Sequence, residues 1–375
     1  MACFEPPSAR MLSTKGRIGT LGMFIIDHFE VRDEAGNAVP ADAEEIGGGG
    51  IYARAFLPPT HCGLIVDRGD DFPEQFARDL ESFGSEMVWF RHRTGKTTRA
   101  LNMYSGHRIG EGHQSFRYLS PQLNLSPRDL ILDPSPFAKP ILPEWIHVVC
   151  NTTRAQLIVD ELVQIRSHGL TGGLGKGWGA QMVWEPLPVC CKFEELDNIL
   201  RLAPSFAVFS PNLLELESIL GIVSSDTPTA SNVVEAAEQF HTRLVQSCGD
   251  PAKPAIIVRA GELGSYTLSS DWRGWVPAFW TEADQDRVVD PTGGGNAFMG
   301  GLCAGLLISK GDIRSASIYA ATAASFAIQQ RGLPHFTREH RGEVWNRDDP
   351  WRRLKELVRR VEELEQSQKV TMHQQ

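Results

Sequence analysis

The most informative stretch in the chain of 375 residues is Asp-Pro-Thr-Gly-Gly-Gly-Asn at 290–296, whose residue types point to chemistry. Two valines before it predict a strand that ends at Asp290, and the apolar run after Asn296 predicts a long helix. Three glycines between a strand and a helix let the backbone turn tightly with its N–H groups exposed. Because these amides and the positive end of the helix dipole point at one spot, the stretch predicts a site for an anion.

Three other predicted strands end in residues that could contact a ligand: Asp27, Ser-Pro-Asn-Leu-Leu-Glu at 210–215, and Gly-Glu-Leu-Gly at 261–264. Asp27 is a turn residue or a ligand contact, and we favour the contact. Glu215 is a helix N-terminal acid that complements the dipole, or a member of a metal network with Asn212, and we favour the network. A run of four glycines at 47–50 opens an apolar segment.

The strands and helices that must position these residues are predicted to alternate regularly from residue 141 onward. Strand-like and helix-like runs alternate, with strands at 145–150, 181–184, 206–210 and 255–259 and helices near 153–167, 193–203 and 233–247. This alternation predicts a parallel sheet with helices on both faces. An earlier buried strand is expected at 18–26, and later helices at 296–309, at 312–330 and from Trp351 onward.

We expect three parts along the chain. Residues 1–17 form an N-terminal tail, residues 18–335 form the α/β domain, and residues 336–375 form a C-terminal helical extension. A small β lid is expected within about 28–60 and 97–118, where basic, aromatic and short alternating segments are mixed.

Composition excludes several classes of protein. The chain has 37 basic and 46 acidic residues, a net charge of -9, which argues against a nucleic-acid partner. The longest run of low polarity, residues 297–308, is too short to cross a bilayer, and the seven cysteines include no C-x-x-C pair. We therefore expect a cytoplasmic protein that binds a small molecule, with no membrane and no nucleic acid.

Residues 290–296 resemble the D-T-x-G-A-G-D signature of the PfkB (ribokinase-like) carbohydrate kinase family. Further motifs occur in the family's order, at Gly22 to Asp27, 47–50, 210–215, 258–264 and 320–332. Together with Trp-Glu-Pro at 184–186, they look most like the fungal maintenance-of-killer branch. The resemblance implies a three-layer α/β/α ribokinase-like fold with a central, mostly parallel sheet and a small β lid.

The resemblance also implies an ATP-dependent phosphotransferase that uses Mg²⁺ and works as a monomer or homodimer. The catalytic group would be Gly293, Gly294, Gly295 and Asn296, and the substrate group Asp27, Gly48, Gly49, Tyr52 and Arg99. The nucleotide group would be Asn212, Arg259, Gly261, Gly264 and Thr292, and the metal group Glu215 and Asp290. Asp290 is alternatively a strand-end cap or a ligand of a monovalent cation.

Two positions depart from the family pattern. Asn296 stands where the family has its base aspartate, and Tyr52 stands where it has a substrate-binding asparagine. Since asparagine cannot remove a proton, three functions stay open: phosphoryl transfer to a hydroxylated or anionic metabolite, a pseudokinase that only binds, and activation of a carboxylate or other acceptor needing no base. The cations Arg91, Arg93, Lys96 and Arg99 are a candidate binding surface for an anionic acceptor.

Overall fold

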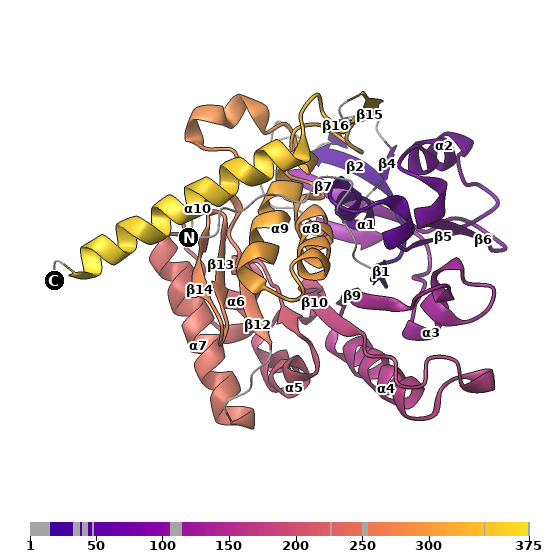
Figure 1. The fold of residues 1–375 in the computed structure, drawn as a ribbon, viewed down its shortest axis with the longest axis horizontal. Coiled ribbons are helices and arrows are strands. Elements are labelled where there is room, and N and C mark those ends of the chain that lie inside the picture. Colours follow the sequence, from indigo (N-terminus) through magenta and orange to yellow (C-terminus); the bar gives the residue numbers. More distant parts are fainter. Residues whose placement is uncertain are drawn as a thin grey trace.

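The computed structural model describes residues 16–32, 38–39, 44–46, 49–105, 115–225, 227–249, 254–340 and 342–373. Its centre is a seven-stranded sheet in the order β1-β9-β10-β11-β12-β13-β14 (Figure 1). The parallel part consists of β1 (Arg17–Thr20), β9 (Pro143–Cys150), β10 (Gln181–Pro186), β11 (Val208–Phe209) and β12 (Ala255–Arg259). Two antiparallel strands continue it, β13 (Ser265–Leu268) and β14 (Arg273–Val276). The expected mostly parallel sheet is confirmed.

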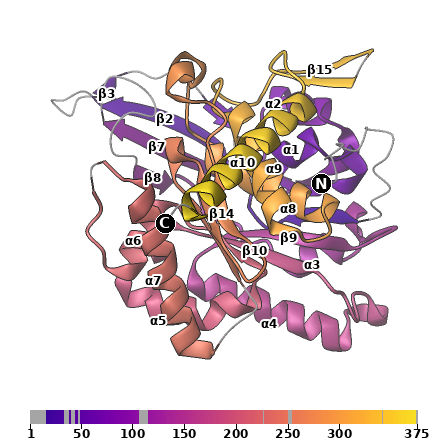
Figure 2. The ribbon, with the colours of Figure 1, turned by 60° about the vertical axis from the view of Figure 1, so that its left-hand side comes forward.

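Helices cover both faces of this sheet, as strands that are apolar on both sides require. Trp145, Val183 and Ile257 belong to a buried cluster with α8 (Gly294–Ile308), α9 (Ile313–Ala327) and α10 (Pro350–His373). Ile146 and Trp184, next in sequence to two of them, belong to the opposite cluster with α4 (Thr152–His168), α5 (Leu196–Leu202), α6 (Leu213–Leu220) and α7 (Ala230–Cys248). The three-layer architecture is confirmed (Figures 1 and 2).

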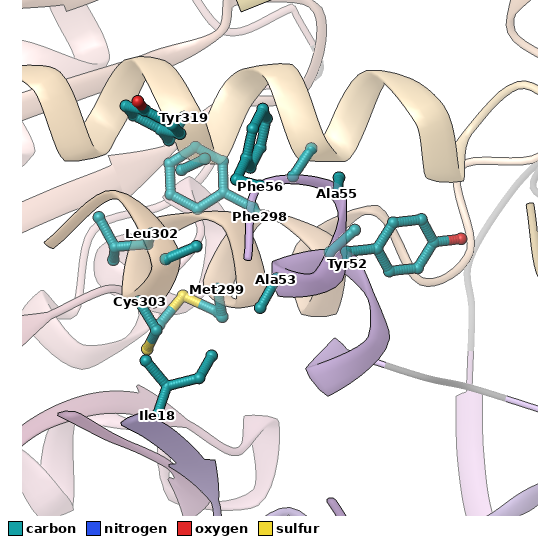
Figure 3. Close-up of a cluster of buried hydrophobic side chains, with 14 of the residues drawn as sticks. Ile18, Tyr52, Ala53, Ala55, Phe56, Phe298, Met299, Leu302, Cys303 and Tyr319 are labelled. Atoms are coloured by element: carbon teal, nitrogen blue, oxygen red, sulfur yellow. The ribbon is translucent and has the colours of Figure 1, made fainter. Parts of the chain in front are cut away.

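The two helices α8 and α9 pack closely because α8 carries glycine on the face that meets α9. A Cβ at Gly301 would lie 2.7 Å from the carbonyl oxygen of Tyr319, and a Cβ at Gly305 would lie 2.7 Å from Ala316 Cα. On its other side α8 contacts α1 (Gly49–Tyr52) and the 3₁₀ helix Ala53–Ala55. Figure 3 shows this cluster, in which Phe56 from the N-terminal segment lies beside Tyr319 of α9.

A second sheet supplies the lid. It consists of β2 (Ile26–Arg32), β3 (Ala38–Val39), β4 (Glu44–Ile46), β7 (Arg99–Ser105) and β8 (Ser115–Tyr118). The single strand expected at 18–26 is wrong, because the chain forms two strands: β1 ends at Thr20 and β2 begins at Ile26. Gly22 lies in the break, and Asp27 is therefore a residue of the lid sheet rather than the end of a central strand.

The remaining elements surround these sheets. They are α2 (Glu74–Ser82) beside the parallel pair β5 (Leu64–Arg68) and β6 (Val88–His92), the short helix α3 (Pro127–Ile131), and the hairpin β15 (Phe336–Glu339) and β16 (Gly342–Trp345). Helix α10 follows this hairpin and crosses α9 (Figure 1). Of the helices in the described ranges, none combines the length and the apolar character that a membrane span requires.

Candidate active site

The glycine turn joins the residues after β14 to helix α8 and is fixed from two directions. Asp290, 1% exposed, accepts a hydrogen bond from the amide of Thr292 at 2.9 Å. The amides of Val289 and Asp290 both donate to the carbonyl oxygen of Ile328 at the end of α9, at 2.8 and 3.2 Å. A Cβ at Gly294 would lie 2.9 Å from Cγ2 of Ile328. The position of the turn is therefore set by α9.

The turn leaves backbone donors at the start of α8. Gly293 is the N-cap with a φ of 77°, a left-handed conformation that favours glycine. Gly294 donates to the carbonyl of Pro291 at 3.1 Å and Ala297 donates to that of Gly293 at 2.8 Å. Within the described ranges the amides of Gly295 and Asn296 have no carbonyl acceptor. Two unpaired amides at the positive end of a 15-residue helix form a site that attracts an anion.

A row of buried polar side chains crosses the sheet and ends beside this turn. Thr20 Oγ1 lies 3.1 Å from His147 Nδ1, and His147 Nε2 lies 3.1 Å from Glu185 Oε2. Arg259 Nη1 pairs with Glu185 Oε1 at 2.9 Å, and Arg259 Nη2 lies 3.5 Å from Glu215 Oε2. A Cβ at Gly295 would collide with Arg259 Nη1. The row thus connects β1, β9, β10 and β12 to the first turn of α8.

The two carboxylates of this row respond differently to burial. Burial favours a higher pKa for Glu185, but the guanidinium of Arg259 and the hydrogen bond from His147 more than offset it, so its pKa is lowered. Burial raises the pKa of Glu215, and neither Arg259 nor the Asn212 amide offsets it. Glu185 is therefore the firmly ionised partner of Arg259.

Asn212 and Glu215 begin helix α6 and bond to each other. The side chain of Asn212 accepts from the Glu215 amide at 2.8 Å, and Glu215 Oε2 accepts from the Asn212 amide at 2.8 Å. This reciprocal capping box satisfies two donors at the helix start. The same segment lies next to the end of β12, where the Arg259 amide donates to the carbonyl of Pro211 at 3.0 Å. Asn212, Glu215 and Arg259 are thus brought together, as the resemblance implies.

The residues expected to hold Mg²⁺ do not fit a metal ion fixed by the protein. Glu215 pairs with Arg259 and Asn212, while Asp290 caps Thr292. Across the described residues, no group of three or more His, Cys, Asp or Glu side chains is gathered as a metal site would need. Mg²⁺ usually keeps several waters and takes one or two carboxylates together with substrate phosphates, and here both candidate carboxylates already have protein partners.

The lid reaches the glycine turn through Tyr104 of β7. Its hydroxyl lies 2.5 Å from Thr292 Oγ1, and its ring stacks on Phe29 of β2 with centroids 6.3 Å apart. Asn102, two residues earlier on the same face of β7, donates to Asp27 Oδ1 at 2.9 Å. Asp27 therefore lies on the side of the lid sheet that meets the turn, and its contact with an acceptor stays a prediction.

The other predicted substrate residues have varied surroundings. Arg99 Nε lies 3.2 Å from Asp71 Oδ2, and its Nη1 lies 3.0 Å from His28 Nε2. Tyr52 is 4% exposed and packs beside Trp345, and in Figure 3 its ring points away from the rest of the labelled cluster. Gly49 begins α1, whereas Gly48 lies outside the described residues. A direct contact of these residues with substrate stays a prediction.

Two of the four cations of the proposed basic surface, Arg91 and Arg99, are paired with carboxylates. Arg91 is bound by two carboxylates, with Nε 2.7 Å from Asp67 Oδ1 and Nη1 2.6 Å from Asp129 Oδ1, and these hydrogen bonds raise its pKa. Arg93 reaches Thr98 Oγ1 at 3.5 Å. Arg91 therefore joins β6 to α3, and its positive charge is balanced by these two carboxylates.

At the end of β12, Gly261 begins a 3₁₀ turn with a φ of 56° and Gly264 follows it with a φ of 94°. A Cβ at Gly264 would collide with the carbonyl oxygen of Val276, so this glycine allows β13 and β14 to approach. Both glycines therefore have a structural role at the end of β12, and their contact with nucleotide stays a prediction.

Sequence reasoning did not assign roles to His147, Glu185, Asn102 and Tyr104. A signal was present for the first two, because a histidine and a glutamate interrupt the apolar strands Pro143–Cys150 and Gln181–Pro186. Buried ionisable groups need partners, which makes such interruptions informative. The lid residues Asn102 and Tyr104 carry no comparable signal, since alternating polar residues are ordinary in a half-exposed strand.

Comparison with known proteins identifies a family match, two relatives and a similar fold. Residues 187–338 match the model of the pfkB family carbohydrate kinase. The chain is 29% identical over 354 residues to Protein MAK32 of Saccharomyces cerevisiae, with 89% of each chain covered. It is 28% identical over 362 residues to an uncharacterised protein of Schizosaccharomyces pombe, with 90% of this chain and 91% of that protein covered. The ribokinase structure from Giardia lamblia has a TM-score of 0.60 at 17% identity, over 85% of this chain and 94% of that one.

Proposed function

We propose that this protein is an ATP-dependent phosphotransferase that acts on a small hydroxylated or anionic metabolite. Its match to the pfkB family carbohydrate kinase model and its ribokinase-like fold support this proposal. The observation that carries the proposal is the glycine turn, where the unpaired amides of Gly295 and Asn296 meet the guanidinium of Arg259. In a loose phosphoryl-transfer transition state, catalysis is largely positioning and stabilisation of charge on the transferring group. Both requirements can be met by this turn.

In this proposal the residues of the site would have distinct roles. Gly293, Gly294 and Gly295 would hold the transferring phosphate, and Asn296, which is exposed, would orient the incoming nucleophile through its side-chain amide. Asp27, held by Asn102, would contact the acceptor from the lid side. We retain ATP and a small-molecule acceptor from the sequence expectations, together with a cytoplasmic location and a monomer or homodimer. A monovalent cation at Asp290 stays a prediction.

Two alternatives follow from Asn296 itself. A pseudokinase would bind nucleotide without transferring phosphate, since no carboxylate stands at this position to deprotonate an alcohol. An enzyme that activates a carboxylate would need no base, because such an acceptor carries no proton at neutral pH. Hydroxylamine trapping with ATP and a carboxylic-acid library identifies the second alternative by hydroxamate formation.

The first experiment measures ATP binding through the thermal midpoint. A ligand at about 100 times its Kd adds about 2.7 kcal/mol to stability, so ATP should raise the midpoint of the wild-type chain. Gly294→Val should remove this shift, since a Cβ at this position already lies 2.9 Å from Ile328 Cγ2 and a larger side chain distorts the turn.

Gly179→Val is the matched control, because a Cβ there meets nothing within 4 Å, and it should keep the ATP shift. Release of ADP with a metabolite panel then separates a transferase from a pseudokinase. If ATP never shifts the wild-type midpoint, with or without candidate acceptors, the phosphotransferase, the pseudokinase and the carboxylate-activating enzyme are all rejected.

A further inference from the structure

The guanidinium of Arg259 is held between the buried carboxylate of Glu185 and the largely buried carboxylate of Glu215, at the edge of the glycine turn. Nη1 lies 2.9 Å from Glu185 Oε1, and Nη2 lies 3.5 Å from Glu215 Oε2 and 3.2 Å from the carbonyl oxygen of Ser210. The side chain is 13% exposed. A positive charge is therefore fixed beside the first turn of α8 before any ligand arrives.

The carboxylates around Arg259 have few oxygen positions left for a metal ion. Glu185 uses Oε1 for Arg259 and Oε2 for His147. Glu215 Oε2 accepts from the Asn212 amide and faces Arg259. Since Mg²⁺ requires near-octahedral oxygen ligands, a planar guanidinium that bridges both carboxylates takes the position that an ion between them would need.

Several donors of Arg259 and its neighbours have no acceptor among the described residues. Arg259 Nε and Ser210 Oγ are both buried, and neither has a hydrogen-bond partner within the described part of the chain. The amides of Gly295 and Asn296 also lack an acceptor in the part of the chain that the structure describes. Donors without an acceptor favour a ligand that supplies several acceptor oxygens. Polyphosphate is the ligand class with that chemistry.

We propose that Arg259 is the resident cation of this site, so that the glycine turn binds the phosphate chain of a nucleotide or a polyphosphate without a divalent metal. Charge-assisted hydrogen bonds from a guanidinium supply the attraction that a metal ion would otherwise supply. The inference rests on the proposed function for the location of the phosphate and goes beyond it in naming the cation.

The test is calorimetric titration of the wild-type chain with inorganic tripolyphosphate and with a non-hydrolysable ATP analogue, each in EDTA and in Mg²⁺. We expect both ligands to bind in EDTA at least as tightly as in Mg²⁺. Binding that appears only when Mg²⁺ is present overturns this inference and leaves the proposed function intact. Absence of binding in both conditions rejects the inference and the proposed function together.

Variants of Arg259 give an independent readout. Arg259→Ala should weaken tripolyphosphate binding in EDTA by about 10- to 100-fold, as expected for hydrogen bonds to a charged group. Arg259→Lys should restore part of the affinity, since an ammonium supplies charge but cannot bridge both carboxylates. Arg273→Ala is the control, because Arg273 is 58% exposed and pairs only with Glu238 among described residues.

The variant Arg259→Ala should also gain the ability to bind a divalent metal ion, which we expect the wild type to lack. Removing the guanidinium leaves Glu185 and Glu215 without their shared cation, so Mn²⁺ alone should raise the thermal midpoint of Arg259→Ala and leave the wild-type midpoint unchanged. A Mn²⁺ shift of equal size in both proteins overturns the proposal. Should Arg259→Ala fail to fold, the comparison of EDTA with Mg²⁺ on the wild-type chain decides the question alone.

Discussion

Asn296 is the residue whose chemistry most affects the choice of acceptor. It is exposed at the start of α8, and in the described chain its side chain has no hydrogen-bond partner. A carboxylate at this position would remove a proton from an alcohol, a contribution of about 10²–10⁴ in rate. Beside an anionic nucleophile at about 4 Å, the same carboxylate would cost about 1–4 kcal/mol through repulsion.

The variant Asn296→Asp should therefore affect two acceptor classes in opposite directions. Turnover of a neutral alcohol should rise at least about 10-fold, whereas turnover of a carboxylate or phosphate acceptor should fall. Steady-state rates of wild type and variant on one acceptor of each class provide the measurement. Equal effects on both classes would show that position 296 does not contact the nucleophile.

At the scale of secondary-structure elements, the lid strand β7 is joined to the glycine turn by the hydrogen bond between the Tyr104 hydroxyl and Thr292. Tyr104→Phe removes this hydrogen bond and keeps the ring that stacks on Phe29. Loss of about 1 kcal/mol of local stability should speed amide exchange in β7 about 5-fold, while the thermal midpoint of the whole chain changes little. Hydrogen exchange followed by mass spectrometry measures this effect.

Tyr118→Phe serves as the control on the neighbouring strand β8, since no hydrogen bond of the Tyr118 hydroxyl occurs among the described residues. Exchange in β7 should then match the wild type. If Tyr104→Phe also leaves the exchange of β7 unchanged, the contact with Thr292 does not hold the lid to the turn.

At the scale of helices and strands, much of the fold could be predicted from the sequence. The alternating runs from residue 141 correspond to β9, α4, β10, α5, β11, α7 and β12, because buried parallel strands and amphipathic helices have distinct periods. The break between β1 and β2 was missed, since the apolar run 18–26 continues through Gly22. Residues 49–55, expected within the lid, form two short helices that pack on α8. Their burial depends on a partner about 240 residues away in sequence.

The candidate site was predictable where a motif is local and unpredictable where distant side chains meet. The turn at 290–296 and the pair Asn212 and Glu215 each lie in a single short segment. The bridge from Glu185 through Arg259 joins strands 74 residues apart, and only the strand order determines that they meet. The interaction of Arg91 with Asp67 and Asp129 was missed for the same reason, so a run of cations was interpreted as a ligand surface.

At the scale of the whole molecule, the free energy of unfolding should depend on pH through Asp348, which pairs with Arg352 and Arg353 of α10. Burial favours a higher pKa for Asp348, but hydrogen bonds from Arg352 and from Arg353, which is 1% exposed, lower it to about 2. A carboxyl whose pKa is depressed in the folded state stabilises the fold above its ordinary pKa near 4 and loses that contribution as pH falls toward 2.

Asp348→Asn should therefore destabilise the chain by about 3 kcal/mol at neutral pH, since it leaves the buried Arg353 without its carboxylate. The difference from wild type should shrink as pH falls from about 4 to about 2. Thermal or urea unfolding across this range measures it. Glu363→Gln removes an exposed partner of Arg359 and should have little effect at any pH. A constant difference between Asp348→Asn and wild type at all pH values would contradict the assignment.

The contacts of Ile328 have a consequence for how natural variants of this chain are compared. Its carbonyl oxygen receives the amides of Val289 and Asp290, and its side chain lies against Gly294, yet it is separated from the turn by two helices in sequence. A change in the size of this side chain would alter the spacing of the turn amides while every residue from 290 to 296 stays the same. Two variants with identical signature motifs can therefore differ in phosphate affinity, and position 328 belongs in any comparison of their activities.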